Sequence, residues 1–375
     1  MIYLDNAATS YFKPECVIKS MIEATALLSA NAGRGGHKLS IKAMDMIYYA
    51  TEAVADLFGI DNPENIAYTQ NATLALNMAI GGILDKGDHA VVTQMEHNSV
   101  LRPVNYYGGN YTVVKADKKG FVNPTAVENA ITPHTKLIVC THASNVCGSI
   151  QPLKEISQIA KKYNIPFLVD AAQTAGCYPL KIKEVGADVL AFSGHKGLMG
   201  PLGTGGLYVS DKIKLKPIIS GGTGSNSESI LQPDFMPDML QSGTLNTPAI
   251  VALGEASRFI MRENTEAIHE KERYLANALT EDLCSIKGIT VYGDITGEKR
   301  NGTVAFNVNG FSSTEVSEYL DKNYSIATRA GFHCAPFAHE ALETGGEGCV
   351  RVSFGYFNDL RDEKILVKAL KSQVK

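Results

Sequence analysis

The feature that most constrains the fold is an alternation of short β-branched runs with longer amphipathic segments between residues 65 and 209. The short runs have the length and composition of buried strands, and helical patterns lie between several of them. Strand–helix alternation of this kind predicts an α/β layer built on a mostly parallel sheet. The predicted strands cover residues 65–69, 90–93, 111–114, 137–141, 167–169, 189–192 and 205–209.

The rest of the chain predicts helices around this sheet and a second, smaller domain. Helices are expected over residues 14–29, 42–58, 73–84, 98–107, 124–130 and 152–163. One long helical stretch over 247–285 then precedes strands at 290–292, 303–308 and 348–354 and helices at 313–323 and 360–371. We expect an N-terminal arm over residues 1–15, a large domain over 16–250 and a small α+β domain over 251–375.

The composition excludes several classes of protein. The chain has 375 residues, 45% hydrophobic and 20% charged, as soluble globular proteins do. Its 35 basic and 39 acidic residues include no long basic run, so neither nucleic acid nor a membrane is an expected partner. Its 7 cysteines form no CxxC pair, which argues against a zinc ribbon or a disulfide framework. We expect a cytoplasmic protein without a metal.

An acid and a lysine follow two of the predicted strands. Asp170 ends one of them, and Lys196 lies behind a small turn after the next. Because the carboxyl ends of parallel strands meet at one edge of a sheet, both side chains are expected at that rim. Pyridoxal 5'-phosphate enzymes need such a pair: the lysine forms a Schiff base with the cofactor, and the acid keeps its pyridine nitrogen protonated. The pair therefore predicts this cofactor.

Further polar side chains are expected at the same rim. Ala72 and Thr73 lie where a strand turns into a helix, and free N–H groups there suit a phosphate, although an ordinary helix cap is the alternative. Ser193 and His195 would supply more phosphate donors. His97 follows another strand and would stack on the cofactor ring, with a structural histidine as the alternative.

Two amides and an arginine extend the candidate site. Asn145 and Gln173 each follow a strand and are expected to donate to the phenolic oxygen of the cofactor. Arg351 lies in an apolar strand and faces away from Val350 and Val352. A buried arginine needs an anionic partner, which is either an amino-acid carboxylate or an acid of the chain itself.

Cys334 lies in a compact, turn-rich segment and follows two cations in sequence, Arg329 and His333. Positive neighbours lower the pKa of a thiol and favour the nucleophilic thiolate. The alternatives are a small buried hydrophobe and a metal site made of His333, Cys334 and His339. We disfavour the metal, because these ligands are crowded into seven residues with no fourth ligand nearby.

The motifs of this chain resemble the cysteine desulfurase and selenocysteine lyase branch of the class V aminotransferase-fold enzymes, and the Arg-x-Gly-x-His-Cys-Ala segment resembles their short-loop (SufS-like) group. The resemblance implies the pyridoxal phosphate-dependent transferase fold (fold type I, aspartate aminotransferase-like) and a homodimer with shared active sites. The matching motifs lie at residues 3–9, 33–37, 69–77, 96–97, 144–146, 170–173, 193–196, 242–247, 329–335 and 350–353.

The resemblance also implies a role for each matching residue. Lys196 would bind the cofactor and move the Cα proton, Asp170 would pair with the pyridine nitrogen, and His97 would stack on the ring. Cys334 would attack the substrate sulfur, and Arg351 would bind the substrate carboxylate. The other implied contacts are Gln173 at the phenolic oxygen, Ala72, Thr73, Ser193, His195 and the other subunit's Thr244 at the phosphate, Asn145 and Arg329 at the substrate, and Arg34 and His37 near the site of the other subunit.

Two departures from the family pattern lie around the thiol. Phe332 stands where a second histidine is usual, and the segment after Cys334 is longer and more aromatic. The predicted function is conversion of L-cysteine to L-alanine, with a persulfide on Cys334 that passes to an acceptor protein. The alternatives are a selenocysteine lyase acting on L-selenocysteine, another class V aminotransferase or β-eliminating lyase, and a non-catalytic sulfur carrier or scaffold.

Overall fold

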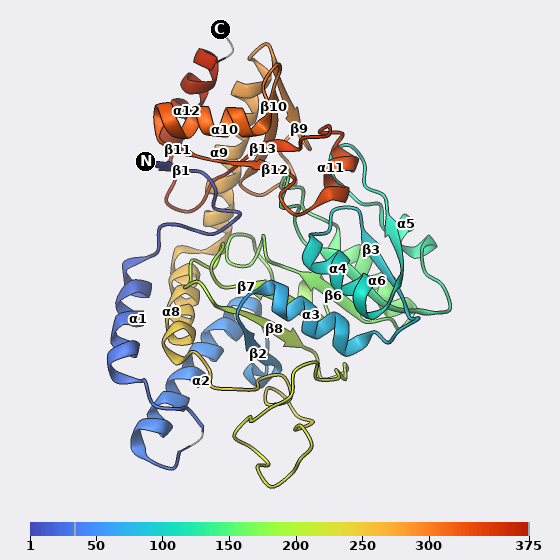
Figure 1. Cartoon of the computed structure of the whole chain (residues 1–375), viewed down its shortest axis with the longest axis vertical. Helices are drawn as coiled ribbons and strands as arrows, with labels where there is room; N and C mark the ends of the chain where they lie inside the picture. Colours follow the sequence, from blue (N-terminus) through green and yellow to red (C-terminus); the bar gives the residue numbers. More distant parts are fainter. Residues whose placement is uncertain (34, 374–375) are drawn as a thin grey trace.

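The computed structural model of the chain describes residues 1–33 and 35–373, and a seven-stranded sheet forms its centre (Figure 1). Its strands are β2 (Ile66–Thr69), β3 (His89–Thr93), β4 (Asn110–Val114), β5 (Thr135–Thr141), β6 (Phe167–Asp170), β7 (Val189–Ser193) and β8 (Gly205–Val209). Their order is β2-β8-β7-β6-β5-β3-β4. Every neighbouring pair is parallel except the two pairs that β8 makes with β7 and β2.

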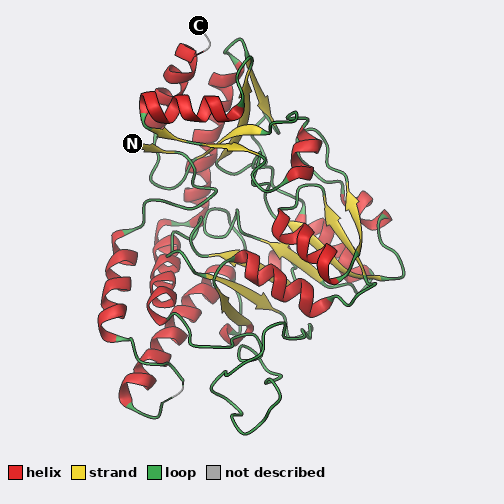
Figure 2. Cartoon of the chain, viewed as in Figure 1, coloured by secondary structure: helices red, strands yellow, loops and turns green. Residues whose placement is uncertain are grey.

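The central strands are buried on both faces, which explains their nearly continuous apolar sequences. Val169 and Leu190 pack in one core, whereas their chain neighbours Leu168 and Val189 pack in a second core on the opposite face. Helices cover both faces, as Figure 2 shows. The first core takes side chains from α2 (Lys38–Phe58), α5 (Pro124–Asn129), α6 (Leu153–Lys162), α7 (Ile182–Val185) and α8 (Thr247–Glu263), and the second from α3 (Ala72–Ile83) and α4 (Asn98–Tyr107).

A second, smaller sheet is antiparallel and lies at the top of Figure 1. Its strands are, in order, β12 (Arg329–Gly331), β13 (Cys349–Ser353), β10 (Thr303–Val308) and β9 (Ile289–Tyr292). Apolar side chains of α9 (Thr265–Cys284), α10 (Ser313–Tyr324) and α12 (Leu360–Gln373) form the core on one face. The N-terminal strand β1 (Ile2–Tyr3) pairs with β11 (Ile326–Ala327), so the first residues of the chain lie beside this sheet.

The structure corrects one predicted helix and adds two short helices that were not predicted. The single helix expected over residues 247–285 is two helices, α8 and α9, that meet at Asn264. Asn264 has φ 67°, in the left-handed region, and its side chain accepts a hydrogen bond from the Glu266 N–H. It therefore ends one helix and caps the next. The two short helices that the sequence analysis missed are α7 and α11 (Pro336–Leu342), and α11 follows Cys334 directly.

The fold class predicted from the sequence is confirmed by the large, mostly parallel sheet and the smaller α+β sheet. The domain limits at residues 15 and 250 stay a prediction. In the structure, α8 packs against α1 (Glu15–Leu27) and α2, while α9 packs against β9 and β10. None of the described helices is long and apolar enough to cross a membrane.

Candidate active site

A cavity of about 270 Å³ lies beyond the carboxyl ends of the central strands. Its walls come from the N-terminal arm, the rim of the large sheet, and the strands β12 and β13 of the small sheet. The structure brings most of the predicted site residues together there, while the role of each stays a prediction. These residues are Ala72, Thr73, His97, Asn145, Asp170, Gln173, Ser193, His195, Lys196, Arg329 and Arg351.

Lys196 and Asp170 form the floor of this cavity. The Asp170 carboxylate is buried and accepts a hydrogen bond from the Ala172 N–H at 2.9 Å. Burial raises its pKa, while that hydrogen bond and Lys196 act in the opposite direction. Burial of the Lys196 amine lowers its pKa to about 8, against the attraction of Asp170 and assisted by Arg351 and Arg329. A lysine with this pKa is partly unprotonated near neutral pH and can act as a nucleophile or a base.

One end of the cavity is suited to an anion. Asn71 caps α3 by accepting a hydrogen bond from the Leu74 N–H, so the cap expected as an alternative is present. The Ala72 N–H donates to the Ser193 hydroxyl at 3.1 Å. His195 has a buried Nδ1 with no hydrogen-bond partner among the described residues. A helix N-terminus with hydroxyl groups and an unsatisfied ring nitrogen is a site that a phosphate would fit.

His97 is held rigidly at the wall of the cavity. It caps α4, and its Nδ1 accepts a hydrogen bond from the Ser99 N–H at 3.0 Å. The Ser99 hydroxyl in turn bonds that of Thr73 at 2.8 Å. Burial, followed by the charge of Lys196, lowers the pKa of His97 to about 4. The ring is therefore neutral at physiological pH, which suits stacking on an aromatic ring.

The two predicted amides make contacts that the sequence did not reveal. The Asn145 amide donates to the His333 carbonyl at 2.7 Å, and the Gln173 amide donates to the Ala7 carbonyl at 3.1 Å. Each amide thus has one N–H directed at the backbone. Their expected contact with a phenolic oxygen would need the remaining N–H and stays a prediction.

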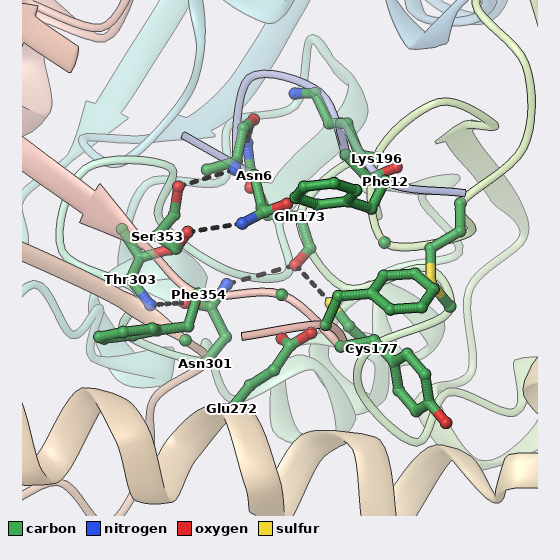
Figure 3. Close-up of a pocket in the computed structure, with 18 of the residues that line it drawn as sticks. Asn6, Phe12, Gln173, Cys177, Lys196, Glu272, Asn301, Thr303, Ser353 and Phe354 are labelled. Carbon is green, nitrogen blue, oxygen red and sulfur yellow. Dashed lines mark hydrogen bonds between the residues drawn. The ribbon is translucent and has the colours of Figure 1, made fainter. Parts of the chain in front are cut away.

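Behind Lys196, a smaller cavity separates the N-terminal arm from the small sheet (Figure 3). Asn301 donates to the Gln173 carbonyl after β6 at 3.2 Å, and Ser353 of β13 accepts from the Ala7 N–H at 2.8 Å, so hydrogen bonds join this part of the chain to both the rim of the large sheet and the N-terminal arm. Glu272 projects toward the same space from α9. Burial raises the pKa of Glu272 to about 8, so this carboxyl is neutral at pH 7.

Arg351 lies on the wall opposite the sheet rim and is 1% exposed. One guanidinium nitrogen donates to Asp5 at 2.7 Å, and another donates to the Asn145 carbonyl at 2.9 Å. The acid of the chain itself, one of the two partners considered from the sequence, is thus present. The buried Nε has no hydrogen-bond partner among the described residues, which leaves a donor for a second carboxylate.

Cys334 is exposed and lies beside the cavity rather than in its lining. The backbone of His333 has φ 51° and that of Cys334 has φ 58°, so both residues are in the left-handed region. The imidazole of His333 turns into the interior, where burial lowers its pKa to about 2. The expectation that His333 is a cation beside the thiol is therefore wrong, because its ring is neutral.

Thr244 and His37, two of the three residues predicted to act at the active site of the other subunit, lie outside the lining of this cavity. Thr244 lines a separate cavity, which also reaches Asn71 and His195. His37 is exposed and caps α2 by accepting a hydrogen bond from the Ser40 N–H. Arg34 lies outside the described residues. Contacts of these three residues with a second subunit stay predictions.

Several residues that line the cavity were not predicted from the sequence. Asn71 and Ser99 neighbour predicted residues, and their polar side chains after strands were a usable signal. Ala7 and Ala8 lie in the N-terminal motif that also holds Asp5, and only folding brings this motif beside Arg351. The missed lining residues are Ala7, Ala8, Asn71, Leu76, Ser99, Thr141, Ala172 and His333.

The chain matches the Aminotransferase class-V family model over residues 2–366. A probable cysteine desulfurase of Methanothermobacter thermautotrophicus is 35% identical over an alignment of 381 positions that covers 98% of this chain and 94% of that protein. A probable cysteine desulfurase of Pyrococcus abyssi is 33% identical, with 100% and 94% covered. The apo structure of cysteine desulfurase from Thermococcus onnurineus NA1 superposes with a TM-score of 0.92 at 33% identity, covering 100% of this chain and 94% of that one.

Proposed function

This chain belongs to the aminotransferase class-V family, and from that premise we propose that it is a pyridoxal phosphate-dependent cysteine desulfurase. It would convert L-cysteine to L-alanine and leave the sulfur as a persulfide on Cys334. The observation that carries the proposal is the pairing of Lys196 with the buried Asp170 at the floor of a cavity whose opposite wall holds Arg351. The names of the relatives support the same activity.

The residues of the cavity fit the proposed cofactor. Pyridoxal phosphate supplies an electron sink for a carbanion at the substrate Cα. Asp170 would hold its ring nitrogen and His97 would cover its ring. The start of α3, with Ser193 and the unsatisfied Nδ1 of His195, would hold its phosphate.

Side chains of this chain would bind the substrate and transfer its Cα proton. Arg351 would bind the substrate carboxylate through its Nε, while Asp5 and the Asn145 carbonyl keep the guanidinium in place. The Lys196 Nζ, whose pKa is about 8, would take the Cα proton and return it later. The pKa of this amine is close enough to neutral pH for the amine to accept and release a proton with similar ease.

Cys334 would receive the sulfur in a balanced displacement. Its thiolate forms a bond to the substrate sulfur while the substrate Cβ–S bond breaks. The electron pair of the broken bond stays with the substrate, whose Cβ takes a proton to become the methyl group of alanine. A thiol acceptor or reductant would then discharge the persulfide.

The test is alanine formation from L-cysteine by the wild type and by Cys334→Ala, with the absorbance of bound cofactor recorded for both. We expect the variant to bind the cofactor and to lose alanine and sulfide formation together. Cys284→Ala is the matched control, because Cys284 is also an exposed free cysteine but lies at the end of α9. Wild-type rates in Cys334→Ala would contradict the persulfide step.

A selenocysteine lyase is the second candidate, and the exposed position of Cys334 outside the cavity lining favours it. Selenide leaves carbon more readily than sulfide, so such an enzyme depends less on a thiol acceptor. Turnover of L-selenocysteine by both the wild type and Cys334→Ala, with no turnover of L-cysteine by the wild type, would select this function.

We also propose that the enzyme is a cytoplasmic homodimer with shared active sites and passes sulfur to an acceptor protein. Exposed apolar side chains on α2, including Leu39, Ile41 and Met44, are a surface that a second subunit would cover. The molar mass in solution, measured by light scattering, tests the dimer. A monomer with full activity would contradict the shared sites.

A further inference from the structure

A chain of buried hydrogen bonds runs behind the nucleophile from Thr344 to the start of β12. The Thr344 hydroxyl lies 2.7 Å from Nδ1 of His339, and Nε2 of His339 lies 3.2 Å from Nδ1 of His333. Nε2 of His333 lies 3.3 Å from the Arg329 carbonyl oxygen. All three side chains are buried, and the two imidazole planes differ by 12°. The rings are thus nearly parallel, with their facing nitrogens within hydrogen-bond distance.

The direction of every hydrogen bond follows from the carbonyl at one end. A carbonyl only accepts, so Nε2 of His333 carries the proton. Burial lowers the pKa of His333 to about 2 and that of His339 to about 4, so each ring is neutral and has one donor and one acceptor. Nδ1 of His333 is then an acceptor, Nε2 of His339 donates to it, and the Thr344 hydroxyl donates to Nδ1 of His339. Every polar atom of the three side chains then takes part in a hydrogen bond.

This hydrogen-bonded relay of Thr344, His339 and His333 ends at the turn that presents Cys334. Two successive non-glycine residues in the left-handed region, His333 and Cys334, are unfavourable unless their surroundings fix them. Their backbone is fixed from outside, because Asn145 donates to the His333 carbonyl and the Asn98 N–H donates to the Cys334 carbonyl, both at 2.7 Å. From inside, the imidazole of His333 is the side chain that joins the turn to β12 and α11.

We propose that His339 and Thr344 are positioning residues for the nucleophile: through His333 they hold the Cys334 turn in the conformation that presents its thiol beside the cavity. Phe332 cannot supply a hydrogen bond at its own position, and its side chain packs edge-on against His339 at 5.3 Å between ring centroids. His339 on α11 thus provides the second imidazole, where a second histidine at position 332 is usual in the family. The inference deepens the proposed desulfurase function and rests on it.

A metal ion is the competing explanation of the same cluster. Cys349 lies near both imidazoles, and the three potential ligand atoms are within 4.8 Å of one another. The hydrogen bonds disfavour a cation there, because the lone pair of each neutral ring already accepts a hydrogen bond. The charge of the Arg351 guanidinium acts to lower the pKa of both His333 and Cys349, and the same positive charge opposes a cation between them. Stoichiometric metal is therefore an outcome that would overturn the proposal.

The test compares variants of the holoenzyme that keep or remove single hydrogen bonds. His339→Gln places an amide N–H near the position of Nε2 and can still donate to His333, whereas His339→Asn places its amide near Nδ1 and cannot. Thr344→Ser keeps the hydroxyl, and Thr344→Val removes it at constant shape. His89→Asn is the matched control, because His89 is a buried histidine that bridges Thr135 and Thr112 at the start of β3.

We expect His339→Asn and Thr344→Val to lower kcat for alanine formation roughly tenfold while KM changes by less than about twofold, since a misplaced nucleophile affects the step after binding. Alkylation of Cys334 by iodoacetamide, followed by mass spectrometry without substrate, should slow by roughly fivefold in the same two variants. His339→Gln, Thr344→Ser and His89→Asn should stay near the wild type in both measurements.

The two measurements separate the inference from the proposed function. Absence of desulfurase activity in the wild type would remove the function, while the alkylation series would still test the relay. Wild-type values of both kcat and alkylation in His339→Asn and Thr344→Val overturn the inference. Equal losses in His339→Gln and His339→Asn overturn it as well, as does one zinc per chain that His339→Asn and Cys349→Ser remove.

Discussion

Glu96 provides the sharpest test of the electrostatics beneath the cavity. It follows β3, is 0% exposed, and accepts hydrogen bonds from the Thr93 hydroxyl at 2.6 Å and the Thr141 N–H at 2.9 Å through the same oxygen. Its other oxygen has no partner among the described residues. Burial raises its pKa from 4.5 to about 8, and the nearby Asp170 adds to the effect. Glu96 is therefore a neutral acid at pH 7, which leaves the negative charge to Asp170.

The cost of this arrangement depends on pH. In the unfolded chain Glu96 loses its proton near pH 4.5, while in the folded chain it keeps the proton up to about pH 8. Its contribution to stability is fully present below pH 4.5 and is lost as the pH rises to 8, at about 1.4 kcal/mol per pH unit. The loss over the whole window is on the order of 5 kcal/mol, of which roughly 3–4 kcal/mol falls between pH 5 and 8.

Glu96→Gln removes this titration and keeps the shape. The amide oxygen can accept both existing hydrogen bonds, so the variant should match the wild type near pH 5 and exceed its free energy of unfolding by roughly 3 kcal/mol at pH 8. Urea unfolding followed by circular dichroism at pH 5, 6, 7 and 8, with equal cofactor saturation, measures the difference. Glu15→Gln, at an exposed position of α1, controls for loss of a charge. Parallel pH curves for the wild type and Glu96→Gln would refute the reasoning.

Three further predictions follow from other parts of the site. Arg351→Lys, which loses the planar fork, should raise KM for L-cysteine roughly 10–100-fold with a smaller change in kcat; an unchanged KM in steady-state assays would exclude Arg351 as the carboxylate ligand. The rate of pyridoxal phosphate attachment to the apoenzyme, followed by absorbance, should rise with pH and level off near pH 8, because the pKa of Lys196 is about 8; a rise that continues to pH 10 would contradict that pKa. A disulfide reagent should modify Cys284 and Cys334 rapidly in the native protein and Cys140, Cys147, Cys177 and Cys349 slowly; mass spectrometry of the labelled peptides checks this order.

Much of the fold could be predicted because both faces of the large sheet are covered. Strands such as β6 and β7 are then apolar at every position but the last, and the polar residues at and after their ends mark the rim where ligands bind. Asp170 and Lys196 were found in this way. The break between α8 and α9 was missed because Asn264 ends one helix and caps the next without an interruption of the amphipathic pattern. A single left-handed residue leaves no trace in the hydrophobic periodicity.

The N-terminal arm shows why the electrostatics of the substrate wall could not be predicted. Arg351 was identified because a charge in an apolar strand demands a partner, and its side chain is 1% exposed in the structure. Its partner, Asp5, is 346 residues away in sequence, and β1 must pair with β11 before the two side chains meet. The sequence therefore indicates that an acid is needed and leaves open which one supplies it.

For Cys334, closeness in sequence was a misleading guide to which side chains surround the thiol. His333 precedes the thiol directly, yet two successive left-handed residues direct its ring into the interior while Cys334 remains exposed. The neighbours that matter for the thiol are Asn98 at the start of α4, Asn145 after β5, and His339 on a helix that the sequence analysis missed. Because these contacts join the large sheet to the small one, a change in how the two parts pack should move the nucleophile relative to Lys196. Substitutions outside the cavity lining but within this contact, His339→Asn first among them, are expected to lower kcat before they affect the binding of the cofactor.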